Sequence, residues 1–154
     1  MPPLSRIEIN ACIVVWFITI LVFGYFSEYS TSVATGDYSM FQNVHVMIFI
    51  GFGFLMAFMA KNSFTAVGHA MMAATFAVVV SFFNYWFWHS FVSNSWTRFK
   101  IGVDQLVNAD FCAASILISF GAVIGRVSLK QLLVMVYFEV VFYSINEAIG
   151  YGGI

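Results

Sequence analysis

The segment "LVNADFCAASILISFGAVIG", residues 106–125, decides the fold class of this chain. Behind a polar head that holds Asn108 and Asp110, it consists almost entirely of apolar and small residues. The hydrocarbon core of a membrane is ~30 Å thick, and a helix of about 20 apolar residues crosses it with its backbone polar groups bonded internally. The segment therefore predicts a transmembrane helix. It also raises the question of why an amide and a carboxylate stand at one end of it.

The composition of the whole chain agrees with a membrane protein. Of its 154 residues, 62% are hydrophobic and only 8% are charged, whereas a soluble domain carries about 25% charged residues. The formal net charge is −1, so the chain lacks the excess of basic residues that attracts nucleic acid. These values exclude an ordinary soluble domain, and we expect membrane lipid, not nucleic acid, to surround the protein.

Five apolar stretches predict an all-α polytopic membrane protein with five transmembrane helices. Segments rich in turn-forming residues separate them. The expected helices cover residues 10–27, 41–60, 64–90, 107–125 and 128–149. Because the connections are short or moderate in length, we expect a single helical domain over residues 1–154.

The basic residues predict how the helices are oriented. If the helices alternate in direction, four Lys and Arg residues lie on one side of the membrane and two on the other. The side with more of them is expected to be cytoplasmic, which places the N-terminus inside. Most acidic residues then lie on the outer side. We expect this acidic outer mouth to concentrate small cations.

The last predicted helix carries a polar stripe that contains Glu139, Tyr143, Asn146 and Glu147. At about 100° per residue these four side chains share one face. A carboxylate at membrane depth is costly and usually faces a partner or a watery cavity, so Glu139 is an intramembrane functional candidate. The alternative is an acid that is hydrogen-bonded between helices and only holds them together. Glu147 lies nearer the outer water, where it lines a vestibule or is simply solvated.

The sequence contains no motif that indicates an enzyme or a cofactor. It has no paired-cysteine metal motif, no phosphate-binding glycine loop and no serine nucleophile elbow. His45 and His89 are both expected near the outer side, but two imidazoles alone make a poor metal site, so we interpret them as interfacial or packing residues. The residues by themselves are compatible with transport or with a structural partner subunit.

Three segments together closely resemble the Rh glycoproteins, the animal branch of the ammonium transporter family. They are "NVHVMIFIGFGFLMAFM" (residues 43–59), "LVNADFCAASILISFGAVIG" (106–125) and "SLKQLLVMVYFEVVFYSINE" (128–147). The resemblance implies an eleven-to-twelve-helix inverted-repeat fold, of which this chain is the N-terminal portion. It also implies a homotrimer or an Rh-family hetero-oligomer in the plasma membrane. Each subunit would hold its own passive pore for ammonia, with carbon dioxide as a possible second solute.

The resemblance assigns roles to the polar head of the 106–125 segment. Phe111 corresponds to a phenylalanine that gates the pore from outside, and Asp110 and Glu147 correspond to the outer vestibule that recruits ammonium. We therefore expect Asp110 and Asn108 to stay solvated in a wet mouth, with the dry pore beginning at Phe111. Shedding a proton there converts a costly ion into a small neutral solute.

The resemblance also implies what this chain would lack. The pore histidines of the family are expected beyond Ile154, and none of His45, His69 or His89 corresponds to them. We therefore predict that this chain alone does not conduct. One alternative is a non-conducting, Rh-like structural membrane subunit. Another is an unrelated cation transporter in which Glu139, at a position where we expect a neutral amide, exchanges protons with solvent.

Overall fold

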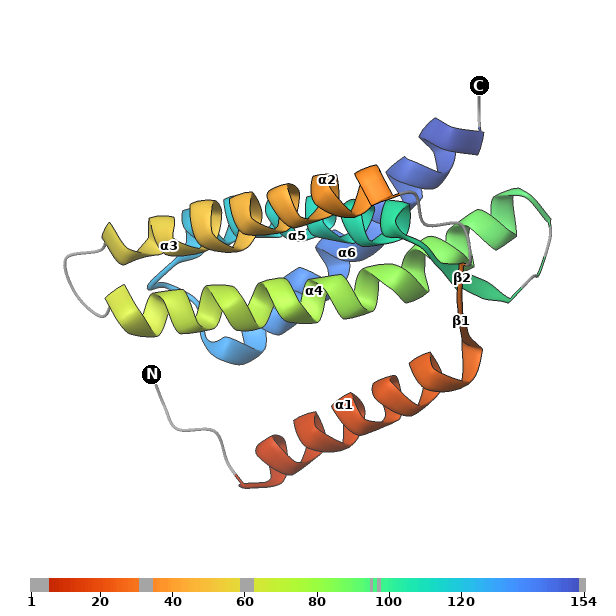
Figure 1. Cartoon of the computed structure of the whole chain (residues 1–154). Helices are drawn as coiled ribbons and strands as arrows, with labels where there is room; N and C mark the ends of the chain where they lie inside the picture. The colour runs from red at the N-terminus through yellow and green to blue at the C-terminus, as the bar shows by residue number, and fades with distance from the viewer. Residues whose placement is uncertain (1–5, 31–34, 59–62, 95, 97, 153–154) are drawn as a thin grey trace.

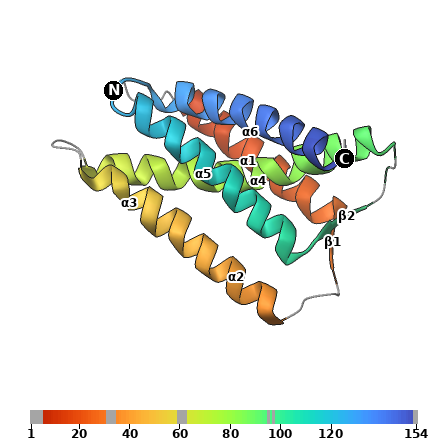
Figure 2. The same cartoon turned by 90° about the horizontal axis from the view of Figure 1, so that it is seen from above.

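The computed structural model describes residues 6–30, 35–58, 63–94, 96 and 98–152 of the chain. Its main helices are α1 (Arg6–Phe26), α2 (Thr35–Val46), α4 (Ser63–Val92), α5 (Val103–Val123) and α6 (Leu129–Gly152). Two short strands, β1 (Ser27–Tyr29) and β2 (Phe99–Ile101), are the other regular elements outside the helical segments. Figures 1 and 2 show α2, α4, α5 and α6 packed as a bundle, whereas α1 lies to one side and meets it near β1.

Four helical segments in the described part of the chain are long and apolar enough to cross a membrane. They are Asp37–Phe58, Ser63–Val92, Val103–Val123 and Leu129–Gly150. In α1 the described apolar stretch is Phe17–Phe26. The predicted all-helical membrane fold is confirmed, and the five predicted helices correspond to five helical regions in the same order.

Two helices begin earlier than the sequence analysis predicted. The second begins at Thr35 rather than at residue 41, and Asp37 in its first turn is favourably placed against the positive end of the helix dipole. α5 begins at Val103 rather than at residue 107. The backbone N–H of Gly102 donates to Oε1 of Gln105 at 2.8 Å, which satisfies one exposed donor at the start of this helix.

The second helical rod changes its winding along its length. After α2 the chain makes a π-helical segment at Met47–Phe52, a short α-helical turn, α3 (Gly53–Leu55), and a 3-10 turn at Met56–Phe58. Ile48 and Met56 are both buried in the bundle core. The rod packs mainly against α5 through α2 and the π-helical segment, and mainly against α4 through α3 and the 3-10 turn.

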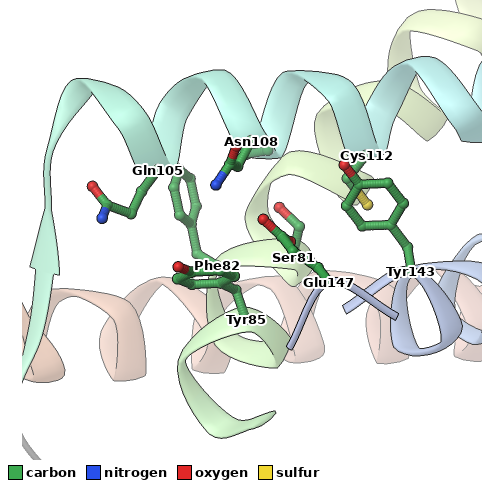
Figure 3. A pocket seen from close by; sticks show the side chains of 9 residues that line it. Ser81, Phe82, Tyr85, Gln105, Asn108, Cys112, Tyr143 and Glu147 are labelled. Atoms are coloured by element: carbon green, nitrogen blue, oxygen red, sulfur yellow. The ribbon is translucent and has the colours of Figure 1, made fainter. Parts of the chain in front are cut away.

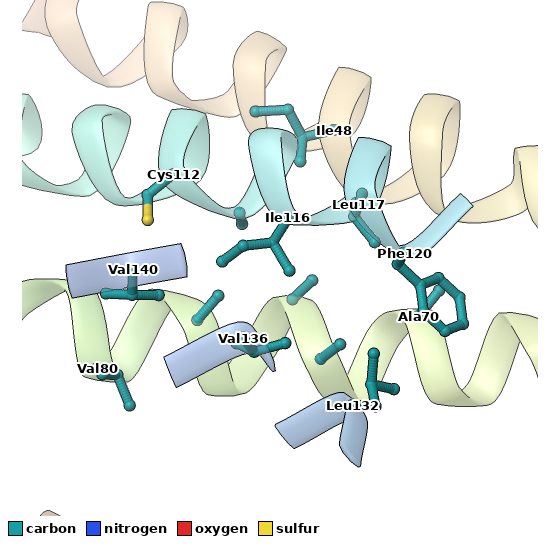
Figure 4. Packing of buried hydrophobic residues seen from close by; sticks show 14 of the residues in the cluster. Ile48, Ala70, Val80, Cys112, Ile116, Leu117, Phe120, Leu132, Val136 and Val140 are labelled. Carbon is teal, nitrogen blue, oxygen red and sulfur yellow. The ribbon is translucent and has the colours of Figure 1, made fainter. Parts of the chain in front are cut away.

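The core lies between α4, α5 and α6, with contributions from the rod that begins at α2 (Figure 4). α4 presents small side chains to it: Ala66, Ala70, Ala73, Ala74 and Ala77 are all buried. Facing them are the larger residues Ile116, Leu117 and Phe120 of α5 and Leu132, Val136 and Val140 of α6. Small residues let helix backbones approach closely, and packing of this kind is what holds helices together in lipid.

A short parallel ladder ties the end of α1 to the segment before α5, and the sequence analysis did not predict it. β1 and β2 pair Ser27 with Phe99, Glu28 with Lys100 and Tyr29 with Ile101. The rings of Phe23 and Phe82 lie 5.8 Å apart between α1 and α4. These contacts fix the C-terminal end of α1 to the bundle.

The turn between α5 and α6 has the predicted chemistry. Gly125 has a φ of 78°, a conformation that glycine adopts without strain and that commonly ends a helix. Ser128 then precedes α6, and its backbone N–H donates to Oε1 of Gln131 at 2.9 Å. This Ser-x-x-Gln pattern is a helix-capping signal. The sharp turn sets α6 beside α5, and so places the polar face of α6 next to the head of α5.

Candidate functional site

A small pocket lies between α4, α5 and α6, close to the start of α5 (Figure 3). Its cavity volume is about 10 Å³, which is close to the space that a single water-sized solute occupies. Three helices contribute to its lining: Ser81, Phe82 and Tyr85 from α4, Gln105, Asn108, Ala109 and Cys112 from α5, and Tyr143 and Glu147 from α6. We call it the Glu147 pocket.

The structure brings two of the predicted vestibule residues together in this pocket. Asn108 and Glu147 both line it, and both side chains are partly buried. Tyr143, from the predicted polar stripe of α6, lines it as well, whereas Asn146 is exposed and is not part of the lining. Glu147 is the one carboxylate among the lining residues.

Sequence reasoning missed most of the other lining residues. Gln105, Asn108 and Cys112 follow one another at helical spacings of three and four, so they share one face of α5. That spacing is the signal in the sequence from which the lining residues of α5 could have been predicted. The α4 side of the pocket had no comparable signal, because Ser81 and Tyr85 sit in a helix that is apolar on most sides.

Asp110 corrects the expectation that it is solvated in a wet mouth. Its side chain is 2% exposed, and it does not line the Glu147 pocket. It contacts His45 of α2 instead: Nδ1 of His45 lies 2.9 Å from Oδ2 and 3.1 Å from Oδ1. Asp110 is two residues after Asn108, a turn of about 200° around the helix, so it faces α2 rather than α6. A buried carboxylate requires such a partner.

His45 is therefore a polar partner of α5, which the sequence analysis did not foresee. The sequence predicts an interfacial or packing histidine here, and the ring of His45 does pack against that of Phe49, with the centroids 4.4 Å apart. Its additional role as the hydrogen-bond partner of Asp110 depends on two residues 65 positions apart. A single sequence contains no signal for such a pair.

Phe111 lies outside the Glu147 pocket. Phe111 is 44% exposed, although it follows the buried Asp110 directly in sequence. Its assignment as a pore gate stays a prediction.

Glu139 makes a contact between two helices. The hydroxyl of Ser119 in α5 donates to Oε1 of Glu139 in α6 at 2.5 Å. Eight residues separate Glu139 from Glu147, about 12 Å along the helix, and Glu139 is not part of the pocket lining. A hydrogen bond between α5 and α6 is what we expect if Glu139 serves to hold these two helices together.

The Glu147 pocket has the chemistry of a site for a small cation or its neutral conjugate. The carboxylate of Glu147 supplies negative charge, and the amide oxygen of Asn108 is an acceptor. Aromatic faces, such as that of Tyr143, attract cations. No group of three or more His, Cys, Asp or Glu side chains within the described ranges could hold a metal ion.

Comparison with known proteins places the sequence of this chain in a family. Residues 7–153 match the family model described as "Ammonium Transporter Family". The chain is 39% identical over 158 residues to "Ammonium transporter Rh type B-A" of Xenopus laevis, which covers 90% of this chain and 34% of that protein. It is 47% identical over 112 residues to "Ammonium transporter Rh type B" of Rattus norvegicus, covering 73% of this chain and 24% of that protein.

The resemblance to the Rh branch is thus confirmed by relatives that bear the Rh name. The chain spans about a third or less of the length of these curated relatives. Its four apolar helices and its family together identify it as an integral membrane protein. On the match over residues 7–153 and the identity to the Rh type B proteins, this chain belongs to the ammonium transporter family.

Proposed function

We propose that this chain forms the outer entrance of a passive ammonia channel, in which the Glu147 pocket recruits ammonium. The observation that carries the proposal is the pocket itself, which gathers one carboxylate, two amides and aromatic rings around a space for a single small solute. The family and the names of its relatives support ammonium or ammonia as the solute. Carbon dioxide is a second solute of similar size that the same dry pore would pass.

Recruitment and conduction would use different forms of the solute. Ammonium is attracted by the Glu147 carboxylate and donates N–H hydrogen bonds to oxygen atoms of the lining. An ion crosses hydrocarbon only at great cost, whereas neutral ammonia does not pay this electrostatic penalty. The proton therefore stays on the outer side, and Phe111 would mark the entrance to the dry part of the pore.

The remainder of the pore would come from further helices of a complete transporter, assembled as a homotrimer or with other Rh-family subunits. The Glu147 pocket itself is small, about 10 Å³, and lies close to the start of α5. We expect proteoliposomes that contain only this 154-residue chain to show no ammonia flux above that of lipid.

The decisive experiment begins with the transcript beyond the codon for Ile154, followed by ammonia flux through the complete product in proteoliposomes. A channel requires that the frame continues into helices with pore histidines. Glu147→Gln should then lower flux several-fold at limiting ammonium. Glu139→Gln is the matched control, because it removes the same charge from the same helix outside the pocket.

Two results would contradict the proposal. One is equal flux in the wild type and Glu147→Gln. The other is a complete product that has no pore histidines and carries no flux, which would favour the non-conducting structural subunit.

A further inference from the structure

Asp110 and His45 form a second polar site near the start of α5, and the proposed ammonium path does not yet use it. Both carboxylate oxygens of Asp110 lie within 3.1 Å of Nδ1 of His45. The side chain of Asp110 is buried, whereas that of His45 is 45% exposed. Among the described residues, His45 is the one histidine paired with a carboxylate. The pair therefore presents an imidazole toward the surface with an acid fixed behind it.

We propose that His45, oriented by Asp110, accepts the proton that ammonium gives up at the channel entrance. The inference rests on the proposed function, because recruitment of ammonium followed by passage of ammonia requires a proton acceptor. Neither the family match nor the lining of the Glu147 pocket assigns that role to a residue.

The contact with Asp110 determines which ring nitrogen of His45 can accept a proton. An ionised carboxylate has only acceptors, so a neutral His45 donates its one N–H from Nδ1 and keeps a lone pair on Nε2. Both contacts to Asp110 use Nδ1, which leaves Nε2 of this half-exposed ring to a partner from solution. The carboxylate also stabilises the imidazolium that forms when Nε2 takes a proton. The pair thus has the chemistry of a proton-accepting dyad.

Two phenylalanine rings hold the imidazole from either side along the second rod. The ring centroid of His45 lies 5.3 Å from that of Phe41 and 4.4 Å from that of Phe49. The three residues follow one another at spacings of four, so they share one face of the rod. Aromatic faces attract cations. They therefore favour both an arriving ammonium ion and the imidazolium that results from proton transfer.

The pair is close to Phe111, the predicted pore gate. His45 and Asp110 each lie within about three turns of the first residue of their helices. Around α5, Phe111 is about 60° from Asn108, which lines the Glu147 pocket, and about 100° in the other direction from Asp110. Phe111 thus lies between the recruiting pocket and the proton acceptor. Ammonium would lose its proton beside the residue at which the dry pore is expected to begin.

The proton transfer needs no reactant besides ammonium and water. One N–H bond of ammonium breaks, its electron pair stays on the nitrogen as the lone pair of ammonia, and the proton bonds to Nε2 of His45. The imidazolium is then paired with the Asp110 carboxylate. Because the ring is half-exposed, it can pass the proton to water on the same side of the membrane, which restores the pair. Ammonia moves on without charge.

The test follows the exchange of ammonium protons with water in the presence of the 154-residue chain. The chain is placed in phosphatidylcholine nanodiscs in slightly acidic buffer, and nuclear magnetic resonance of isotope-labelled ammonium measures the exchange rate. A group that takes a proton from ammonium and passes it to water raises this rate. We expect the chain to raise it above the rate with empty nanodiscs.

His45→Gln and Asp110→Asn should each remove most of the rate that the chain adds. Glutamine at position 45 can still donate to Asp110, and asparagine at position 110 can still bond to His45, so both variants keep a hydrogen-bonded pair. Circular dichroism checks that they fold. Asp110→Asn retains the imidazole but removes the charge that stabilises imidazolium, which a merely structural role of Asp110 would not register in the exchange rate.

The matched control is His89→Gln, which makes the same substitution at an exposed imidazole near the end of α4. It should leave most of the added rate in place. An exchange rate equal to that of empty nanodiscs would overturn the proposal, and so would equal losses in His45→Gln and His89→Gln. An unchanged rate in Asp110→Asn would also overturn it, since orientation and charge from Asp110 are part of the proposal.

Failure of this inference and failure of the proposed function give different results. Proton exchange takes place at the entrance and requires no transport, whereas the Glu147→Gln experiment measures flux. Flux that depends on Glu147, together with exchange that does not depend on His45, would remove the assignment of His45 alone. Exchange that depends on His45 in the absence of flux would support the proton acceptor and count against the channel.

Discussion

The Nδ1 atom of His45 lies 2.9 Å from Oδ2 of Asp110, and this pair joins α2 to α5 in the head region of the bundle. The side chain of Asp110 is 2% exposed and that of His45 is 45% exposed. The pair therefore has one end in the core and the other at the surface. Removing the outer partner leaves a carboxylate buried without its hydrogen bond, which is far costlier than losing an exposed ion pair.

His45→Ala should destabilise the chain by about 3 kcal/mol, because it leaves Asp110 buried and unpaired. His89→Ala removes an exposed imidazole at the end of α4 and should cost well under 1 kcal/mol. The free energies of unfolding can be compared by denaturant titration in micelles with circular dichroism. Equal stability of the two variants would show that the His45–Asp110 contact contributes little.

Ser119→Ala should cost about 2 kcal/mol, since the hydroxyl donates to the Glu139 carboxylate across two helices. Ser115→Ala is the control on the same helix. Its hydroxyl donates at 2.8 Å to the carbonyl of Cys112 in its own helix, which already has helical partners. We expect little change there. If Ser115→Ala costs as much as Ser119→Ala in the same unfolding assay, the cross-helix bond is not the cause.

Ser144→Ala should leave the stability unchanged or raise it by about 1 kcal/mol. The hydroxyl of Ser144 is buried, and among the described residues it is the one buried side-chain polar atom without a hydrogen-bond partner. Removing an unsatisfied buried group relieves its desolvation penalty. Thermal unfolding in micelles measures the effect. A clear loss of stability would mean that the hydroxyl has a partner.

Ala74→Leu should destabilise the bundle by about 2 kcal/mol or more, because Ala74 is fully buried where α4 packs closely against its neighbours. Ala122→Leu introduces the same side chain at an exposed position of α5 and should be nearly neutral. The comparison of unfolding midpoints separates overpacking from a general effect of added apolar volume. Similar midpoints for both variants would contradict close packing at Ala74.

Tyr143→Ala should speed the reaction of Cys112 with a small thiol reagent. Cys112 lines the Glu147 pocket but is fully buried, and the ring of Tyr143 forms part of the wall. Removing that ring opens a path to the sulfur. The measurement uses a Cys12→Ser background, and mass spectrometry follows labelling with time. Tyr137→Ala, which removes an exposed ring from the same helix, should leave the rate unchanged.

The sequence was sufficient to predict the helices and their order, because the length of an apolar stretch alone predicts a membrane-spanning segment. It was less reliable at helix ends. The stretch from Thr35 to Met40 is polar enough to be interpreted as a loop, yet it forms the first turns of α2. The ladder between β1 and β2 was beyond prediction, since each strand has only three residues and pairing depends on how the helices pack.

The candidate site was predictable in part. Glu147 follows from the polar stripe of the last predicted helix and Asn108 from the polar head of the 106–125 segment with the Rh resemblance, and both line the pocket. The resemblance to the Rh proteins places Asp110 in a wet mouth, but its carboxylate is buried and contacts His45, which comes from a different helix. Polarity along one helix cannot identify the helix that a side chain faces. Long-range partners of this kind become visible only when the helices are packed.

The π-helical segment Met47–Phe52 lets the second rod hold one residue more than an uninterrupted α-helix of the same course. A π-helical turn holds one more residue than an α-helical turn, since its bonds join residues five apart rather than four. Deleting one residue there would allow an uninterrupted α-helix, which has better local geometry. Because the π-helical turn with its extra residue and the α-helical turn without it each complete about one revolution, the residues beyond the deletion would keep their direction, with Met56 in the core and His45 beside Asp110. The same deletion within α2 would instead turn everything after it by roughly 100°. In this rod, the effect of a one-residue deletion therefore depends on whether it falls within the π-helical segment.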